Sequence, residues 1–170
     1  LKDIVVASFI YGDYAYFGTE YIILEKKLKS DLSNVSSLDF AGSSGDYAEE
    51  MDSNGTHIGM SDEGNTLFFI RISNFSMDGS AALSKGNCQE TLYHEAANGS
   101  KYWYVTSEGS PSYIVKVNAA TKAETASLNV GINDISDIQR IGDKLIVDSY
   151  NGHQAAIIDI ATFTVDRIVY

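Results

Sequence analysis

The sequence of 170 residues lacks several residue types and patterns, and each shortage excludes a class of structure. Cys88 is the single cysteine, so no disulfide can form within the chain. No apolar run approaches the roughly 20 residues that span a bilayer. No long stretch places apolar residues at the spacing of an amphipathic helix. We therefore expect no membrane span and a core built from strands.

Positive charge is also scarce. The chain has 12 Lys and Arg against 23 Asp and Glu, which gives a formal net charge of −11. Nucleic acids and anionic membranes are bound through clusters of Lys and Arg. We therefore expect neither among the primary partners. Solubility alone is a sufficient reason for an acidic surface.

The residues that are abundant favour short strands and tight turns. Apolar residues make up 44% of the chain, which is enough for a packed core, and the length fits one domain, 1–170. The 14 glycines, the single proline and the many Tyr, Ile, Val, Ser and Thr residues are typical of strands joined by turns. The first residue is Leu1 rather than Met, so we expect a processed or recombinant product, or part of a longer chain.

A turn glycine before a strand-like run recurs four times, at intervals of 43, 44 and 43 residues. The four landmarks are Gly12, Gly55, Gly99 and Gly142. They divide the chain into units of approximately 1–40, 41–86, 87–130 and 131–170. We expect the four glycines to occupy equivalent positions in four successive sheets. Internal repeats of this length are typical of propellers and solenoids.

Each unit contains four candidate strands. The first strands are expected at 4–10, 46–51, 90–96 and 134–141, and the second at 14–19, 57–61, 102–107 and 145–150. The third are expected at 21–25, 66–72, 112–117 and 155–160, and the last is clearest at 123–130 and 164–170. The third strands contain near-continuous apolar runs, which suit burial on both faces. We therefore expect four runs to be largely buried: Ile22–Leu24, Leu67–Ile70, Ile114–Val117 and Ile157–Ile160.

Four short strands over about 43 residues is the period of a β-propeller blade. A single sheet of this kind leaves both of its faces exposed to solvent. Stacking one sheet on another buries these faces. The sequence therefore predicts an all-β fold, a β-propeller with four blades in this chain. A β-sandwich would also have closely spaced strands, but it does not need a regular recurrence.

The segment GDKLIVDSYNGHQAAIIDIATFTVDRIVY at the C-terminal end resembles the YVTN-type β-propeller repeat. The stretch at 98–131 resembles it too, with Tyr-Val-Thr-Ser at 104–107 where that family has Tyr-Val-Thr-Asn. The resemblance is good over 98–170, fair over 8–30 and weak over 46–84. It implies kinship with quinoprotein-like and lactonase-like propellers. Those proteins are mostly extracytoplasmic, and many are binding or scaffold domains.

Four units fill the chain, so two arrangements of the blades are open. In the first arrangement the ring closes with four blades, which is the lower end of the usual range of blade number. Otherwise the ring is open, and the outer faces of the first and fourth blades need cover. A second copy or the rest of a longer propeller chain would then supply it. We expect association or truncation rather than a closed ring.

By the resemblance, the turns between second and third strands lie on one face around the central channel. In this chain those turns carry Glu20, Asp62, Glu63, Glu108, Asn151 and His153. Four of the six are carboxylates, so they would form an acidic rim that attracts cationic ligands. The simpler interpretation is that loops are polar. No His or Cys spacing and no Asp-rich loop matches a metal motif, so we expect no metal and no cofactor.

Two functions fit these observations. The first is a non-catalytic, extracytoplasmic binding or scaffold propeller that presents its loops to a protein, glycan or small-molecule ligand. The second is a lactonase-like or quinoprotein-like enzyme, or a subunit of one. The enzyme would need Glu20, Asp62, Glu108 and His153 to converge on the channel face. Carboxylates within about 5 Å of one cation would favour the enzyme.

Overall fold

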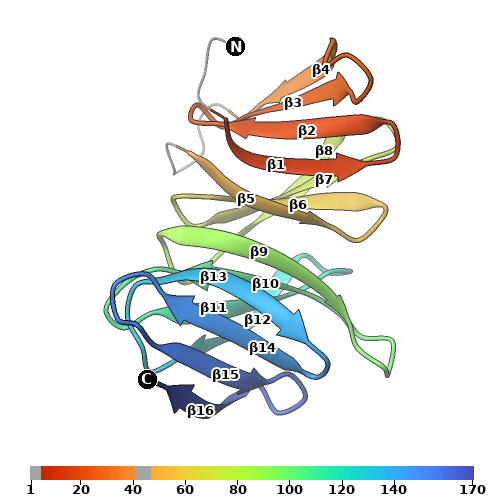
Figure 1. The fold of residues 1–170 in the computed structure, drawn as a ribbon. Helices are drawn as coiled ribbons and strands as arrows, with labels where there is room; N and C mark the ends of the chain where they lie inside the picture. Colours follow the sequence, from red (N-terminus) through yellow and green to blue (C-terminus); the bar gives the residue numbers. More distant parts are fainter. Residues whose placement is uncertain (1–4, 41–46) are drawn as a thin grey trace.

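The computed structural model describes residues 5–40 and 47–170. Their sixteen strands form four antiparallel sheets of four consecutive strands each (Figure 1). The first two sheets contain β1 (Val5–Tyr11), β2 (Tyr14–Thr19), β3 (Ile23–Leu28), β4 (Asn34–Asp39), β5 (Ala48–Ser53), β6 (His57–Asp62), β7 (Thr66–Arg71) and β8 (Ser76–Ala82). The last two contain β9 (Cys88–Glu95), β10 (Lys101–Ser107), β11 (Tyr113–Asn118), β12 (Ala123–Asn129), β13 (Ile135–Ile141), β14 (Lys144–Ser149), β15 (Ala155–Asp159) and β16 (Thr164–Val169).

In every sheet the turn between the first and second strands contains a glycine, although the turns differ in length. This glycine adopts a left-handed backbone, with φ of 59°, 84°, 79° and 63° at Gly12, Gly55, Gly99 and Gly142. A residue with a Cβ atom is strained in this conformation, whereas glycine is not. Each of the four glycines therefore lies in the turn between the first and second strands of its sheet, as predicted. The predicted all-β fold of four sheets is confirmed.

Successive sheets pack face to face, and an apolar core fills each of the three contacts between them. One buried pair represents each core, in chain order: Tyr16 with Met51, Phe69 with Trp103, and Tyr104 with Ile158. Within the described residues these are the cores between the first and second, second and third, and third and fourth sheets. Each sheet therefore depends on its neighbours for burial.

The sheets form an open arc. The innermost strands pack in succession, β1 on β5, β5 on β9 and β9 on β13. The first and fourth sheets lie at opposite ends of the stack (Figure 1), and no comparable packing joins β1 to β13 in the part of the chain that is described. The closed four-bladed ring is therefore not the arrangement that this chain adopts.

Burial of the third strands depends on their place in the arc. Leu67–Ile70 of β7 are all buried, as predicted, and the predicted run Ile114–Val117 of β11 is buried except for Lys116. In β3 and β15 the pattern alternates instead, so Ile23 and Ile157 are only half-buried. The predicted burial therefore holds for Ile22, Leu24, Ile158 and Ile160 but not for Ile23 and Ile157, because the outer faces of the first and fourth sheets have no neighbour.

Apolar side chains are exposed on both outer faces. Ile10 of β1 is 63% exposed and Ile141 of β13 is 64% exposed. Their chain neighbours Phe9 and Arg140 point the other way, towards the adjacent sheet, as alternation along a strand requires. Ile10 and Ile141 therefore lie on the two outer faces that the sequence analysis expected to need cover.

Two predicted strands begin in the wrong place or outside the described residues. The third strand of the first unit was expected at 21–25 but is β3, two residues later. Ile22 has φ of 53°, and its N–H donates to the carbonyl of Thr19 at 3.0 Å, so residues 20–22 form the turn. Residues 4, 41 and 46 of the predicted elements lie outside the described residues. None of the described residues forms a helix long and apolar enough to cross a bilayer.

Candidate functional site

The innermost strand of each sheet has a β-bulge where it pairs with the second strand. In β5, for example, Ala48 pairs with Asp62 and Met51 pairs with Met60, so β5 has one more residue than β6 between these two pairs. A bulge takes its extra residue out of the ladder and re-aims the side chains around it. At or beside the bulges of three successive sheets stand the carboxylates Glu50, Glu90 and Asp137.

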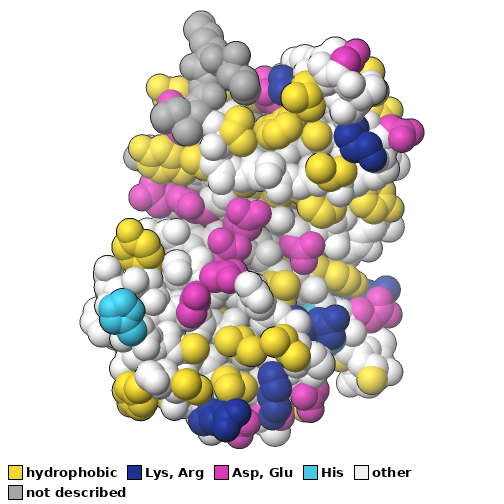
Figure 2. Space-filling model, viewed as in Figure 1, with side chains coloured by type: hydrophobic (Ala, Val, Ile, Leu, Met, Phe, Trp, Pro, Cys, Tyr) yellow, Lys and Arg dark blue, Asp and Glu magenta, His cyan; other side chains and the backbone are white. Residues whose placement is uncertain are grey.

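These three residues, together with Glu49 of β5 and Asp148 of β14, form a group that we call the axial acidic cluster. Four of its members, Glu49, Glu50, Asp137 and Asp148, raise the pKa of Glu90 by repulsion. Figure 2 shows the Asp and Glu side chains gathered in a band over β5, β9 and β13. The equivalent strand of the first sheet, β1, has no carboxylate within its bounds.

Burial and repulsion hold part of the cluster in the protonated form near neutral pH. Burial is the main cause that raises the pKa of Glu90 to about 8. Burial likewise raises the pKa of Glu49 to about 7, with contributions from Glu63, Glu108 and Glu50. No Lys, Arg or His of the described residues lies within ion-pair distance of Glu49, Glu50 or Glu90. A cation placed here would favour the ionised carboxylates.

Five of the six residues predicted from the sequence lie in turns between second and third strands, and the sixth, Asp62, is the last residue of β6. These turns line one edge of the arc, the left edge in Figure 1. Glu63 and Glu108 lie near enough to Glu49 to raise its pKa. The structure therefore brings two of the six residues close to the axial acidic cluster.

The other four predicted residues are not drawn together. Asp62 is buried, and its carboxylate accepts a hydrogen bond from the N–H of Thr66 at 2.7 Å, so it holds the turn. Asn151 and His153 are exposed, and Glu20 is half-buried. No group of three or more His, Cys, Asp or Glu that could hold a metal ion is found among the described residues, Glu20, Asp62, Glu108 and His153 included.

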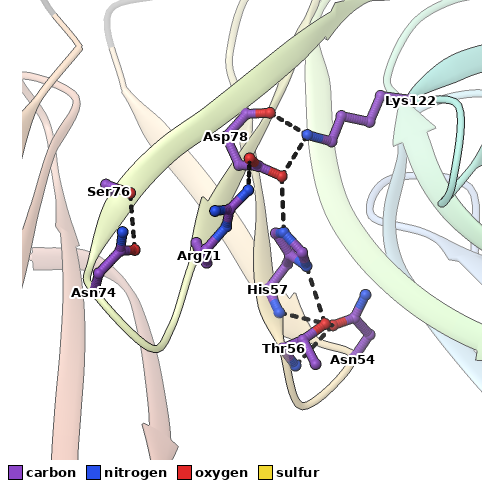
Figure 3. Close-up of polar contacts among 8 residues, drawn as sticks. All are labelled: Asn54, Thr56, His57, Arg71, Asn74, Ser76, Asp78 and Lys122. Atoms are coloured by element: carbon purple, nitrogen blue, oxygen red, sulfur yellow. Dashed lines mark hydrogen bonds and ion pairs between the residues drawn. The ribbon is translucent and has the colours of Figure 1, made fainter.

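A second polar cluster lies on the outer side of the sheets, centred on Asp78 of β8 (Figure 3). Its carboxylate accepts hydrogen bonds from Lys122 Nζ at 2.6 Å and His57 Nε2 at 2.9 Å, and from the guanidinium of Arg71. The hydrogen bond from Lys122 is the largest cause that lowers the pKa of Asp78 to about 2, and His57 adds to it.

The Asp78 cluster joins two sheets. His57 and Arg71 belong to the second sheet, whereas Lys122 comes from the turn before β12 of the third. Asn54 positions the histidine, because its side-chain oxygen accepts the N–H of His57 at 2.7 Å. All three basic groups bind the carboxylate of Asp78, so this cluster links the second and third sheets. We call this link the Asp78 clasp.

The sole cysteine offers no reactive thiol. Cys88 is buried in the core between the second and third sheets. Burial raises the pKa of its thiol to about 12, so the thiolate is not available near neutral pH.

Sequence reasoning missed the axial acidic cluster, although a signal was present. The runs AEEMD, CQETL and ISDIQ place an acidic residue at the third position in three successive units. The innermost strands were found, but nothing in the residues alone marks the bulge that gathers those positions on one surface. Cross-strand register supplies that information.

Stacked four-stranded antiparallel sheets, with their first strands packed side by side at the inner edge, define a β-propeller arc. No family model and no curated protein matches the sequence. Solved propeller structures do match. The RRP9 WD40 repeats match with a TM-score of 0.84 at 8% identity, over 100% of this chain and 52% of that chain. BamB from Moraxella catarrhalis matches with a TM-score of 0.71 at 17% identity, over 98% and 50%.

The Neurospora crassa Pan2 WD40 domain is similar as well, with a TM-score of 0.78 at 9% identity over 98% of this chain and 50% of that chain. At such identities the likeness concerns the fold. The chain spans about half the length of each of these propellers.

Proposed function

We propose that the chain is a non-catalytic binding and scaffold propeller of the YVTN type, and that its axial acidic cluster binds cationic groups of a partner. The observation that carries the proposal is the set of carboxylates from three successive sheets that form no ion pair with a basic group of residues 5–40 and 47–170. Like charges held together without neutralisation cost free energy, and a bound cation removes that cost. Lys and Arg side chains of a partner protein are the cations that suit an extended acidic band.

Binding of a cation should release protons. Glu90 and Glu49 have pKa values of about 8 and about 7, so both are partly protonated at neutral pH. A positive charge beside them lowers these pKa values and expels the protons. Calorimetric titration in two buffers of different ionisation enthalpy measures this release.

A capped tetralysine peptide at low ionic strength is a suitable probe for the cluster. The variant Glu50→Gln/Glu90→Gln/Asp137→Asn should weaken its binding at least tenfold. The control Asp13→Asn/Asp31→Asn/Asp166→Asn removes the same number of carboxyl groups from exposed sites elsewhere and should change binding less than about threefold. Equal losses in the two variants would mean that net charge alone attracts the peptide, and the proposal would fall.

We infer further that the arc is completed by other propeller sheets, from a second copy or from the rest of a longer chain. Two observations support this: the bare apolar flanks at Ile10 and Ile141, and propeller neighbours about twice as long as this chain. Two such arcs joined head to tail would make a ring of eight sheets, within the common range.

The extracytoplasmic location is a proposal that depends on the resemblance of 98–170 to YVTN-type repeats. Fractionation of the cells that make the protein tests it. The protein should be found in the periplasmic, surface or secreted fraction. Recovery with the cytoplasmic fraction alone would overturn this part of the proposal and leave the acidic binding surface unaffected.

A further inference from the structure

A pocket of about 670 Å³ opens between the third and fourth sheets. Its lining includes residues of the β9–β10 and β13–β14 turns. These turns lie at the edge of the arc opposite the turns between second and third strands (Figure 1). Its volume is within the range of pockets that hold small organic ligands. The pocket is distinct from the axial acidic cluster in position and in charge.

Two cations line this pocket in a chain that has few. Lys116 Nζ lies over the ring of Tyr102, 4.1 Å from its centroid, and 5.2 Å from the centroid of Phe163. Arg140 donates one hydrogen bond, to the carbonyl of Gly142 at 3.0 Å. Neither Lys116 nor Arg140 has a carboxylate within ion-pair distance among the described residues.

The acidic residues of the lining do not cancel these cations. Glu95 already forms an ion pair with Lys101 at 3.3 Å. Asp143 lies in the exposed β13–β14 turn. Burial, and then the positive charges of Arg140 and Lys116, lower the pKa of His94, which keeps its imidazole neutral near pH 7. The lining of the pocket therefore presents two positive groups and a neutral ring.

One residue of the lining also has a buried hydroxyl without a hydrogen-bond partner. Tyr104 lines the pocket and is completely buried, and its OH makes no hydrogen bond. Burial raises the pKa of this phenol to about 12, so it remains a donor. An unpaired buried donor costs free energy that an acceptor from a ligand would recover.

The interface between the first and second sheets contains the same aromatic arrangement and acts as an internal control. There Lys26 Nζ lies over the ring of Tyr14, 3.9 Å from its centroid, and 5.8 Å from Phe75. The buried hydroxyl of Tyr16 is unpaired, as that of Tyr104 is. We call this arrangement of a lysine over two aromatic rings the stack. Because the stack occurs at both interfaces, it does not by itself define a ligand site.

The two interfaces differ in the residues that surround the stack. By strand pairing, Tyr11 and Ser53 of the first interface stand where His94 and Arg140 stand in the second. Tyr11 reaches across and donates to the carbonyl of Gly55 at 3.1 Å, which links those two sheets directly. Arg140 adds a second cation, and His94 replaces that bridging phenol. Of these two interfaces, only the one between the third and fourth sheets thus combines the stack with a second cation.

We propose that this pocket binds a small aromatic carboxylate. Arg140 and Lys116 would hold the carboxylate, since guanidinium and ammonium groups form strong charge-assisted hydrogen bonds with it. The hydroxyl of Tyr104 would donate to the same oxygens. The aromatic ring of the ligand would pack against Tyr102 and the alanine side chains of the rim, Ala97 and Ala161.

The test uses 3-phenylpropionate as the probe, with 3-phenylpropanamide and acetate as partners that lack the charge or the ring. Titration followed by NMR should show saturable shifts for 3-phenylpropionate at millimolar concentration or below, confined to amides of the third and fourth sheets. The amide and acetate should bind at least tenfold more weakly. No saturation below about 10 mM, or equal binding of the amide, would overturn the proposal.

Variants separate a ligand role from a structural one. Arg140→Met should weaken 3-phenylpropionate binding at least tenfold and leave the thermal midpoint nearly unchanged, because Arg140 is exposed. Tyr104→Phe should weaken binding severalfold without loss of stability. Lys26→Met, the matched control in the first interface, should leave binding unchanged. Unaltered binding in Arg140→Met would contradict the assignment.

Discussion

The indole ring of Trp103 lies directly over Gly59, across the interface between the second and third sheets. A Cβ atom at residue 59 would be 2.6 Å from Cζ3 of the tryptophan. Trp103 is fully buried and packs edge-on against Phe69, with ring centroids 6.1 Å apart. The absence of a side chain at Gly59 is thus what lets the two sheets approach.

We therefore predict that Gly59→Ala destabilises the fold by about 1–3 kcal/mol, the usual cost of overpacking a core. Urea denaturation followed by tryptophan fluorescence measures the change. Gly86→Ala is the control, because a Cβ there would meet no atom closer than 3.5 Å. A Gly59→Ala protein as stable as the control would contradict the observed contact.

Two adjacent isoleucines of β15 should respond differently to truncation. Ile158 is fully buried between the third and fourth sheets, and Ile158→Ala should cost about 2–5 kcal/mol. Ile157 faces away from the third sheet and is half-buried, so Ile157→Ala should cost about 1 kcal/mol or less in a monomer. Chemical denaturation compares the two. A larger cost at Ile157 that grows with protein concentration would indicate that a second copy covers this flank.

Stability should fall as pH rises between about 4.5 and 8. The folded chain raises the pKa of Glu49 to about 7 and of Glu90 to about 8, from a usual value of 4.5. In this window the folded state holds more protons than the unfolded state, so raising the pH favours unfolding. Urea midpoints at pH 5, 6, 7 and 8 should decline, and Glu90→Gln should flatten the decline. A slope unchanged by Glu90→Gln would show that other groups set it.

Loss of the Asp78 carboxylate should weaken the clasp between the second and third sheets. Asp78→Asn removes the charge that Lys122, Arg71 and His57 share, so the thermal midpoint should fall. The fall should shrink in 1 M NaCl, because salt screens exposed ion pairs. In a double-mutant cycle with Lys122→Met, the two effects should be non-additive. Additive effects would mean that the two residues do not interact in solution.

Association should be visible in the isolated chain of 18.5 kDa. Two exposed apolar flanks on one soluble monomer are unusual, so sedimentation equilibrium at micromolar concentration should give a dimer or heterogeneous larger species. Ile141→Glu on the flank should shift the population to monomer. Met77→Glu, on the exposed part of β8, should not. A cooperative monomer of the unaltered chain would refute head-to-tail closure.

The sequence predicted the repeated part of the fold well, because it depends on local signals. Gly12 and its three equivalents mark left-handed turns that few other residues tolerate, and apolar runs such as Leu67–Ile70 mark covered strands. The strand beginning at Ile23 was placed two residues early, because Ile22 adopts a left-handed turn conformation that β-branched residues seldom take. The outermost strands β4 and β8 lack a strong apolar pattern, and the sequence did not locate them.

The candidate site was less predictable, because it is assembled across sheets. Glu63 and Glu108 were expected at a rim, but Glu50 and Glu90 come together through bulges and through the packing of β5 on β9. Asp62 was expected at the same rim and is instead buried, where it holds its turn. Likewise, no sequence spacing links Arg140 to Lys116, since strand pairing and sheet packing bring them into one pocket.

The three separate cores make this arc a row of coupled units with nearest-neighbour interactions. In such a row each inner sheet is held from two sides, and each end sheet from one. The end sheets should therefore open without the middle ones, and amide hydrogen exchange should slow towards β6, β7 and β10. A partner that caps the flank at Ile141 or Ile10 would then raise protection mainly in the sheet it touches, and exchange rates would report which end it occupies.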